Sequence, residues 1–286
     1  MTIDVETRNS ALACPICRTA SNEERSFEDV SLWRCPECDH CFTNQSRLKN
    51  LEEYDDTYYD KTHSNWFLYP NYSLFDRIRR RIKKLGITAS VIDVGCGRGQ
   101  FLKYIREREP HFRLTGIDVS PVPPEDQILF RRGDFLTYEF KETFDAVVSL
   151  STIEHVPDVQ LFVKRLGQLC RPGGMVFIMT PNDRSLLYEA ARPLFALGVR
   201  APFERLYSRH HLHHFNKTSL KRLMEQHGLP IDERFDHNIP LAAVDIPPVS
   251  RVQRAIFFLG VIVTFAFGKL TGRTYLQTLV CGRRAY

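Results

Sequence analysis

The sequence has no long uninterrupted apolar run, and this shortage argues against a standard membrane-spanning helix. Its longest apolar stretch, AIFFLGVIVTFAFG at residues 255–268, falls short of the ~20 residues that a span needs. The N-terminal segment MTIDVETRNS is polar and lacks the apolar core of a secretory signal peptide. We therefore expect a cytoplasmic protein.

A block of like charge is also missing. The chain has 39 Lys and Arg against 34 Asp and Glu, a formal net charge of +5. Such a mild excess does not indicate a polyanionic partner, and we do not expect nucleic acid to bind. With 286 residues and 43% hydrophobic content, the chain can form a complete α/β domain with a smaller unit appended.

Two nucleotide-binding signatures are absent from the glycine-rich segment VIDVGCGRGQFL, residues 91–102. Mostly β-branched residues lead into Gly95, Gly97 and Gly99, a pattern that predicts a strand, a tight turn and a helix. Gln100 occupies the place of the third glycine of the dinucleotide fingerprint, and the G-K-[S/T] ending of a phosphate-binding NTPase loop is missing. Both absences weaken the two commonest nucleotide interpretations of such a turn.

Cysteine, in contrast, is plentiful, with five of the eight residues in the first 41 positions. Two C-x-x-C knuckles are separated by 17 residues, a spacing typical of zinc ribbons in which four thiolates surround one ion. The predicted ligands are Cys14, Cys17, Cys35 and Cys38. A closed four-ligand site leaves no position for substrate, so we predict a structural zinc that folds a small N-terminal unit.

Two further donors lie beside the second knuckle. Either His40 or Cys41 could replace Cys38 as a ligand, although the knuckle spacing favours Cys38.

Strand-like and helix-like segments alternate along the rest of the chain. RLTGIDV, QILFRRGDF, FDAVVSLS and GGMVFIMTPN have the composition of strands, and DVQLFVKRLGQLC and TSLKRLMEQHG that of helices. This alternation predicts a parallel α/β fold. We divide the chain into a zinc ribbon (1–48), a tyrosine-rich segment that ends in an amphipathic helix (49–87) and the α/β domain (88–286).

Residues 88–184 resemble the core of the class I S-adenosylmethionine-dependent methyltransferases. The resemblance is carried by VIDVGCGRGQFL, GIDVS, GDF, FDAVVSLSTIEHVPD and LCRPGGMVFIMTPN, which follow in the family's order and spacing. It implies a Rossmann-like seven-stranded sheet whose last strand, here YLQTLVCGRR, is antiparallel. It also implies S-adenosylmethionine as the cofactor.

The resemblance gives the glycine turn a function. Gly95 and Gly97 would let the backbone approach the cofactor, and the following helix N-terminus suits the methionine carboxylate. Asp118 can accept hydrogen bonds from both ribose hydroxyls, with a helix cap as the alternative, and Asp134 with Phe135 resembles the family's adenine-side pair, with a turn aspartate as the alternative. The expected cofactor-binding residues are Asp93, Gly95, Gly97, Gly99, Asp118, Val119, Asp134, Phe135 and Leu150. Leu150 and the following Ser151, after the fourth strand, would close the pocket.

Two histidines are the candidates for catalysis. The sulfonium methyl is already activated, whereas a hydroxyl acceptor needs a base to remove its proton. His155 lies in IEHVPD after the fourth strand, where a structural or cofactor-side role is the alternative. His211 lies in RHHLHHFN, which resembles the family's element beside the acceptor, with surface capping as the alternative. That four-histidine segment lacks a carboxylate or cysteine partner, so it is not a zinc site of a known kind.

Two apolar inserts, residues 185–215 and 239–273, lie outside the minimal core. In the second, the stretch 255–268 is flanked by Arg251, Arg254, Lys269 and Arg273. Such flanks suit an interfacial helix at the inner face of the membrane or the wall of an acyl-accepting pocket. A lid helix packed on the domain is the plainer alternative.

The sequence favours methyl transfer to a small-molecule or lipid-linked acceptor of glycolipid type, at a hydroxyl oxygen. An rRNA base methyltransferase is the closest alternative, because a family of guanine-N1 rRNA methyltransferases carries an N-terminal cysteine ribbon. The second knuckle of that ribbon normally offers a histidine where this chain has Cys-x-x-Cys, and the apolar inserts suit bases poorly. A non-catalytic cofactor-binding protein with docking surfaces is the third interpretation.

Overall fold

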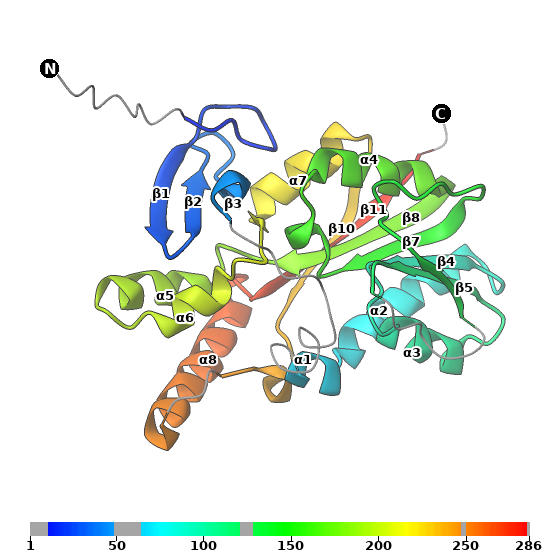
Figure 1. The fold of residues 1–286 in the computed structure, drawn as a ribbon. Coiled ribbons are helices and arrows are strands. Elements are labelled where there is room, and N and C mark those ends of the chain that lie inside the picture. Colours follow the sequence, from blue (N-terminus) through cyan, green and yellow to red (C-terminus); the bar gives the residue numbers. More distant parts are fainter. Residues whose placement is uncertain (1–10, 49–63, 121–127, 247–249, 285–286) are drawn as a thin grey trace, which may run out of the picture.

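The computed structural model describes residues 11–48, 64–120, 128–246 and 250–284. A seven-stranded sheet forms the centre of the α/β domain (Figure 1). The strand order is β10-β11-β8-β7-β4-β5-β6. The strands are β4 (Ser90–Val94), β5 (Arg113–Asp118), β6 (Leu129–Arg132), β7 (Phe144–Leu150), β8 (Cys170–Pro181), β10 (Ile231–His237) and β11 (Leu276–Gly282). All neighbours from β8 to β6 pair in parallel, and β11 is antiparallel to both β8 and β10. The predicted sheet with an antiparallel last strand is confirmed.

Helices cover both faces of this sheet. Ile92 of β4 and Val147 of β7 pack against α4 (Val159–Leu169) and α7 (Lys217–Gln226). Their neighbours Val91 and Val148 face the other way, against α2 (Tyr72–Ile82) and α3 (Gln100–Arg108). Side chains alternate between the faces of a strand, so the continuous apolar runs in the sequence reflect burial on both sides.

The ribbon shares its sheet with the α/β domain. Strands β1 (Asn22–Phe27), β2 (Val30–Arg34) and β3 (Cys41–Thr43) form an antiparallel sheet, and its fourth strand is β9 (His213–His214). Cys41 pairs with His214 and Phe42 with His213. The sequence did not predict this pairing, because strands as short as these carry no periodic signal of their own.

Apolar and charged contacts also join the ribbon to the first insert, which forms α5 (Leu186–Ala196) and α6 (Ala201–Leu206). Phe27 of β1 packs edge-on against Phe203 of α6, with ring centroids 5.5 Å apart. Arg34 donates to Asp183, just after β8, at 2.8 Å. The boundary predicted at residue 48 falls where the described residues stop, and it stays a prediction.

The second insert forms the short η5 (Leu241–Ala243) and the long helix α8 (Arg251–Thr271). The helix has 21 residues, and its most apolar 18-residue window has a mean hydropathy of 1.6, so α8 is long and apolar enough to cross a membrane by length and composition. Only 11% of that window is buried. The fourteen apolar residues 255–268 thus lie within a longer helix, and their shortness does not argue against a span. Ser250 and Gln253 form a capping box at its start and Gly272, at φ 67°, ends it.

Candidate active site and metal centre

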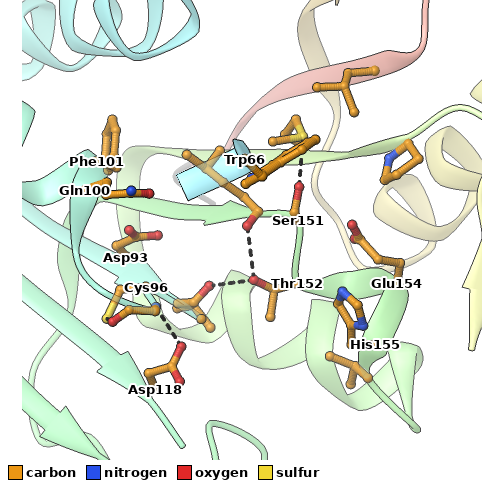
Figure 2. Close-up of a pocket in the computed structure, with 18 of the residues that line it drawn as sticks. Trp66, Asp93, Cys96, Gln100, Phe101, Asp118, Ser151, Thr152, Glu154 and His155 are labelled. Carbon is orange, nitrogen blue, oxygen red and sulfur yellow. Dashed lines mark hydrogen bonds between the residues drawn. The ribbon is translucent and has the colours of Figure 1, made fainter. Parts of the chain in front are cut away.

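A cavity of about 550 Å³ opens at the carboxyl ends of the parallel strands (Figure 2). Ligands bind at this edge in open α/β sheets, because the loops that follow the strands converge there. The walls come from the turns after β4, β5 and β7, from α1 (Ser64–Leu68), from η4 (Ile153–His155), from residues 210–212 and from η5.

The glycine turn after β4 forms one wall. Gly95 and Gly97 have φ values of 74° and 50°, in the left-handed region that side chains with a β-carbon rarely adopt. A β-carbon on Gly95 would overlap the Thr152 side chain, whose hydroxyl donates to the Val94 carbonyl at 3.2 Å. Gly99, also at positive φ, begins α3 and is not among the residues that line the cavity. Its position makes it a structural glycine of the turn.

Asp118, at the end of β5, is held by two backbone amides. The Gly97 N–H donates to Oδ2 at 2.8 Å, drawn as the dashed line that ends on Asp118 in Figure 2. The Ser120 N–H donates to Oδ1, also at 2.8 Å. Burial nevertheless raises the pKa of Asp118 above its usual value. Each carboxylate oxygen can accept a second hydrogen bond, so the group is positioned to receive donors from a ligand in the cavity.

Asp93, at the end of neighbouring β4, has a different environment. Its side chain is buried and lines the cavity, yet Oδ1 has no hydrogen-bond partner in the structure. Burial, reinforced by the charge of Asp118, raises the pKa of Asp93 to about 8. An unpaired buried carboxyl oxygen costs free energy, and a cationic ligand group would relieve that cost.

The remaining predicted cofactor-binding residues also line the cavity, namely Val119, Asp134, Phe135 and Leu150. Asp134 accepts the Leu136 N–H at 2.8 Å through Oδ1, so the turn role weighed for it is present as well. Phe135 is buried against Phe162, with ring centroids 5.3 Å apart. The structure therefore brings together all the predicted cofactor-binding residues except Gly99.

The two predicted catalytic histidines lie side by side in the cavity wall. The rings of His155 and His211 are 4.9 Å apart at their centroids, and Glu154 joins them. One donor atom of each of the three side chains lies within 4.8 Å of the others. Such a cluster could accept a proton or hold a divalent cation.

The environment of this cluster defines its protonation. The pKa of Glu154 is raised to about 7 by burial, and its Oε2 accepts a hydrogen bond from the Thr180 hydroxyl at 2.9 Å. Burial lowers the pKa of His211 to about 4, so its imidazole is neutral near pH 7. Nδ1 of His155 lies 2.9 Å from the His210 carbonyl and Nδ1 of His211 lies 3.3 Å from the Leu206 carbonyl. A carbonyl only accepts, so these contacts place the ring protons on Nδ1 and the lone pairs on Nε2.

The second histidine pair of RHHLHHFN, His213 and His214, faces the ribbon instead. The Nδ1 atom of His213 lies 3.2 Å from the Nε2 atom of His40, and His214 is buried beside Tyr207. Burial lowers the pKa of both His213 and His214. These residues belong to the joint between ribbon and domain.

The ribbon's four predicted ligands converge. The sulfur pairs Cys14–Cys38 and Cys17–Cys35 lie 3.6 and 3.4 Å apart. A tetrahedral zinc with four thiolates has sulfur atoms about 3.8 Å apart, so this set fits such an ion. His40 points instead to Ser219 and His213, and the Cys41 sulfur lies 3.8 Å from Glu24, so neither alternative ligand joins the cluster.

Two contributors escaped the sequence analysis. Glu154 precedes His155 in the quoted IEHVPD motif, but its burial comes from the tertiary fold. Trp66 of α1 also lines the cavity, and no local pattern in the sequence indicates it (Figure 2). Ser151, expected beside Leu150, lies in the cavity wall at φ 53°.

Comparisons with known proteins agree with this geometry. A family model described as a methyltransferase domain matches residues 68–233. A ubiquinone biosynthesis O-methyltransferase of Mesorhizobium japonicum is 32% identical over 124 residues, 38% of this chain and 44% of that protein. The 2-methyl-6-phytyl-1,4-hydroquinone methyltransferase of Synechocystis sp. is 32% identical over 105 residues, 33% of each chain. The chain thus spans less than half the length of these two relatives.

A solved structure shares the fold. Haemonchus contortus phosphoethanolamine N-methyltransferase 2, in complex with S-adenosyl-L-methionine, superposes with a TM-score of 0.53 at 14% identity. The match covers 83% of this chain and 61% of the other. At this identity the likeness concerns the fold alone.

Replacing Asp118 tests the cofactor pocket. Asp118→Ala removes an acceptor for a ligand diol and the anchor of the Gly97 amide. We expect S-adenosylhomocysteine to bind at least about tenfold more weakly, corresponding to the loss of roughly 1.5–3 kcal/mol from charge-assisted hydrogen bonds. Isothermal calorimetry measures the change. Asp232→Ala, at an exposed carboxylate of β10, is the matched control. Unchanged affinity in Asp118→Ala would remove this residue from the site.

Metal analysis and amide hydrogen exchange test the metal centre. Purified protein should contain about one zinc per chain. Cys35→Ser should lose the metal and deprotect the amides of β3 and its partner β9, while α3 keeps its hydrogen-exchange protection. Cys41→Ser, beside the cluster, should keep the zinc. Metal-free wild-type protein with a fully protected ribbon would contradict the assignment.

Proposed function

Because the chain belongs to the class I S-adenosylmethionine-dependent methyltransferases, we propose that it methylates a hydroxyl oxygen of a small molecule with an apolar body. The proposal rests above all on the cluster of Glu154, His155 and His211. These three groups, all able to accept a proton, line the same cavity as the cofactor-binding residues. A hydroxyl acceptor, unlike an amine with a lone pair, needs such a base during attack.

Four groups of this chain would contact the cofactor. Asp118 would accept hydrogen bonds from the ribose hydroxyls, and the unpaired oxygen of Asp93 would receive the ammonium group. The N-terminus of α3 offers backbone N–H groups to the carboxylate, and Phe135 offers an apolar wall to the base. When bound, S-adenosylmethionine supplies a methyl group that its sulfonium already activates.

We assign removal of the acceptor's hydroxyl proton to the histidines. Nε2 of His155 or His211 carries the lone pair that can take the acceptor's hydroxyl proton, since Nδ1 of each ring faces a carbonyl. Glu154, with a pKa of about 7, can share or receive that proton. The carbonyls of His210 and Leu206 hold the two rings in orientation, so the base is positioned before the acceptor arrives.

The cavity walls favour an acceptor with an apolar part. Trp66, Tyr69, Ile239, Ala243 and Tyr275 line it together with the cluster. Such a lining with a few polar groups is typical of a small-molecule site. The names of the two sequence relatives, for ubiquinone biosynthesis and for a phytyl hydroquinone, support a hydroxylated ring with an apolar chain. A glycolipid-type acceptor belongs to the same chemical class of polar head and apolar tail.

For the ribbon we propose a structural zinc. The four thiols leave no position on the metal for another ligand. The ribbon reaches His211 through its strand β3, which pairs with β9, and β9 begins two residues after His211. The metal would therefore stabilise the segment that carries His211 without touching the acceptor.

Histidine substitutions test the reaction. His211→Gln and His155→Gln should each lower kcat by about 10²–10⁴-fold, the usual contribution of a positioned base, and leave S-adenosylhomocysteine affinity nearly unchanged. The assay uses radiolabelled S-adenosylmethionine with a panel of prenylated phenols. His227→Gln, whose imidazole bonds Gln160 away from the cavity, is the control. Wild-type turnover in both cluster variants would refute the assignment of the base.

Proton release tests Asp93 independently. With a pKa of about 8, this carboxyl is mostly protonated at pH 7 in the free protein. An ammonium group bound beside it favours the ionised form, so binding of S-adenosylhomocysteine should release up to about one proton. Calorimetry at pH 7 in buffers of different ionisation enthalpy measures this number. Asp93→Asn should abolish the release, and buffer-independent heats for the wild type would contradict the account.

A further inference from the structure

Helix α8 has two apolar faces, and the protein covers only one of them. On the inner face Phe265 and Gly268 are buried, and the Phe265 ring stacks on Tyr275 with centroids 6.2 Å apart. A β-carbon on Gly268 would lie 2.8 Å from the Arg273 carbonyl oxygen, so this end of α8 lies close against the chain that leads into β11. Figure 1 shows the rest of α8 extending away from the sheet, with α5 in contact near its inner end.

The outer face is an exposed apolar stripe. Its members recur every three or four residues and therefore lie on one side of the helix. They are Val252, Ile256, Leu259, Val263, Phe267 and Leu270. Val252 and Leu270, at opposite ends of the stripe, are 70% and 81% exposed. Single exposed apolar residues are ordinary, but a surface helix of a soluble protein carries polar residues on such a face.

The charges on α8 are all of one sign. Arg251 and Arg254 lie in its first turn and Lys269 in its last, and no acidic residue occurs in the helix. All three cations are exposed. Arg251 and Lys269 lie on the same side of the stripe, near its two ends, whereas Arg254 lies on the opposite side of the helix. A flat anionic surface with an apolar interior complements this arrangement along the whole helix.

We propose that α8 is a membrane-docking helix that lies flat in the surface of an anionic bilayer. The stripe from Val252 to Leu270 enters the boundary of the acyl chains, and Arg251 and Lys269, beside the stripe, contact lipid head groups. The protein body replaces the polar face that a free interfacial helix would have. The cytoplasmic leaflet, which carries the anionic lipid, is the matching surface. This docking does not depend on the reaction that the enzyme catalyses.

Chain connectivity excludes the spanning orientation that the composition of α8 alone would permit. The chain comes to α8 from η5, which contacts α1, and leaves it for β11 in the central sheet. Seven residue steps separate Ala243 from Ser250, and they reach about 25 Å at most, less than the ~30 Å hydrocarbon core. A spanning α8 would also force this connection through lipid with its backbone groups unpaired. The flat orientation avoids both problems.

A second copy of the chain is a poorer occupant of the stripe. In an antiparallel two-fold pair packed through the stripe, Arg251 of one copy would lie near the equivalent of Lys269 in the other. This arrangement places like charges together without an acid on the helix to compensate. The charge pattern therefore favours lipid over self-association.

Vesicle flotation of the full chain tests the proposal. Wild-type protein should float with vesicles of phosphatidylcholine containing phosphatidylserine, less with phosphatidylcholine alone, and less as salt rises. Ile256→Gln/Leu259→Gln/Val263→Gln, on the stripe, should lower the partition coefficient by at least about tenfold. The matched control, Ile87→Gln/Leu129→Gln/Leu161→Gln, changes three exposed apolar residues elsewhere and should float like the wild type.

Three results would overturn the proposal. One is equal flotation of the stripe variant and the wild type. Another is that light scattering shows a dimer for the wild type and a monomer for the stripe variant, while neither protein floats. A third is floated protein that resists alkaline carbonate extraction, which indicates a spanning helix. Circular dichroism and S-adenosylhomocysteine binding of each variant verify that it is folded.

Discussion

Two buried carboxyl groups on adjacent parallel strands are the constraint from which the pocket follows. Asp93 is the last but one residue of β4 and Asp118 is the last of β5, and parallel pairing brings both to one edge of the sheet. Asp118 is satisfied because the turn after β4 adopts positive φ and directs the Gly97 amide toward it. Asp93 Oδ1 is left without a partner. The fold thus stores an unfavourable interaction in the free protein that a cationic ligand can relieve.

The ribbon helps to position the histidine cluster. Thr43 of β3 donates its backbone N–H to the Leu212 carbonyl at 2.9 Å and its hydroxyl to the His211 carbonyl at 3.0 Å. These bonds hold the backbone of the segment that carries His211. On the far side of that segment, the Leu212 N–H donates to the Glu154 carbonyl at 2.7 Å. The backbone of 211–212 is therefore fixed between the ribbon and η4, and both neighbours contribute to the geometry of the base.

Much of this could be predicted from sequence, because the decisive signals are local. The spacing of Gly95, Gly97 and Asp118 along the chain, the alternation of strands and helices, and the paired cysteine knuckles each depend on short segments with a physical requirement. The antiparallel last strand followed from the family resemblance rather than from any pattern in that strand.

What escaped prediction depends on contacts between distant segments. Nothing in the two residues of β9 indicates that they pair with β3, some 170 positions earlier. Glu154 looks like an ordinary loop acid until burial raises its pKa. The length of α8, for which no prediction was made, could have been predicted locally. Ser250 with Gln253 and the terminal Gly272 are capping signals that outline all 21 residues.

The central claim is that one cavity holds the cofactor and presents it to the cluster of Glu154, His155 and His211. A crystal structure of the full chain with S-adenosylhomocysteine tests it most directly. The account predicts the ribose hydroxyls on Asp118, the ammonium group beside Asp93 and the sulfur atom facing the two histidines. A ligand bound outside this cavity, or one whose sulfur faces away from the histidine cluster, would contradict it.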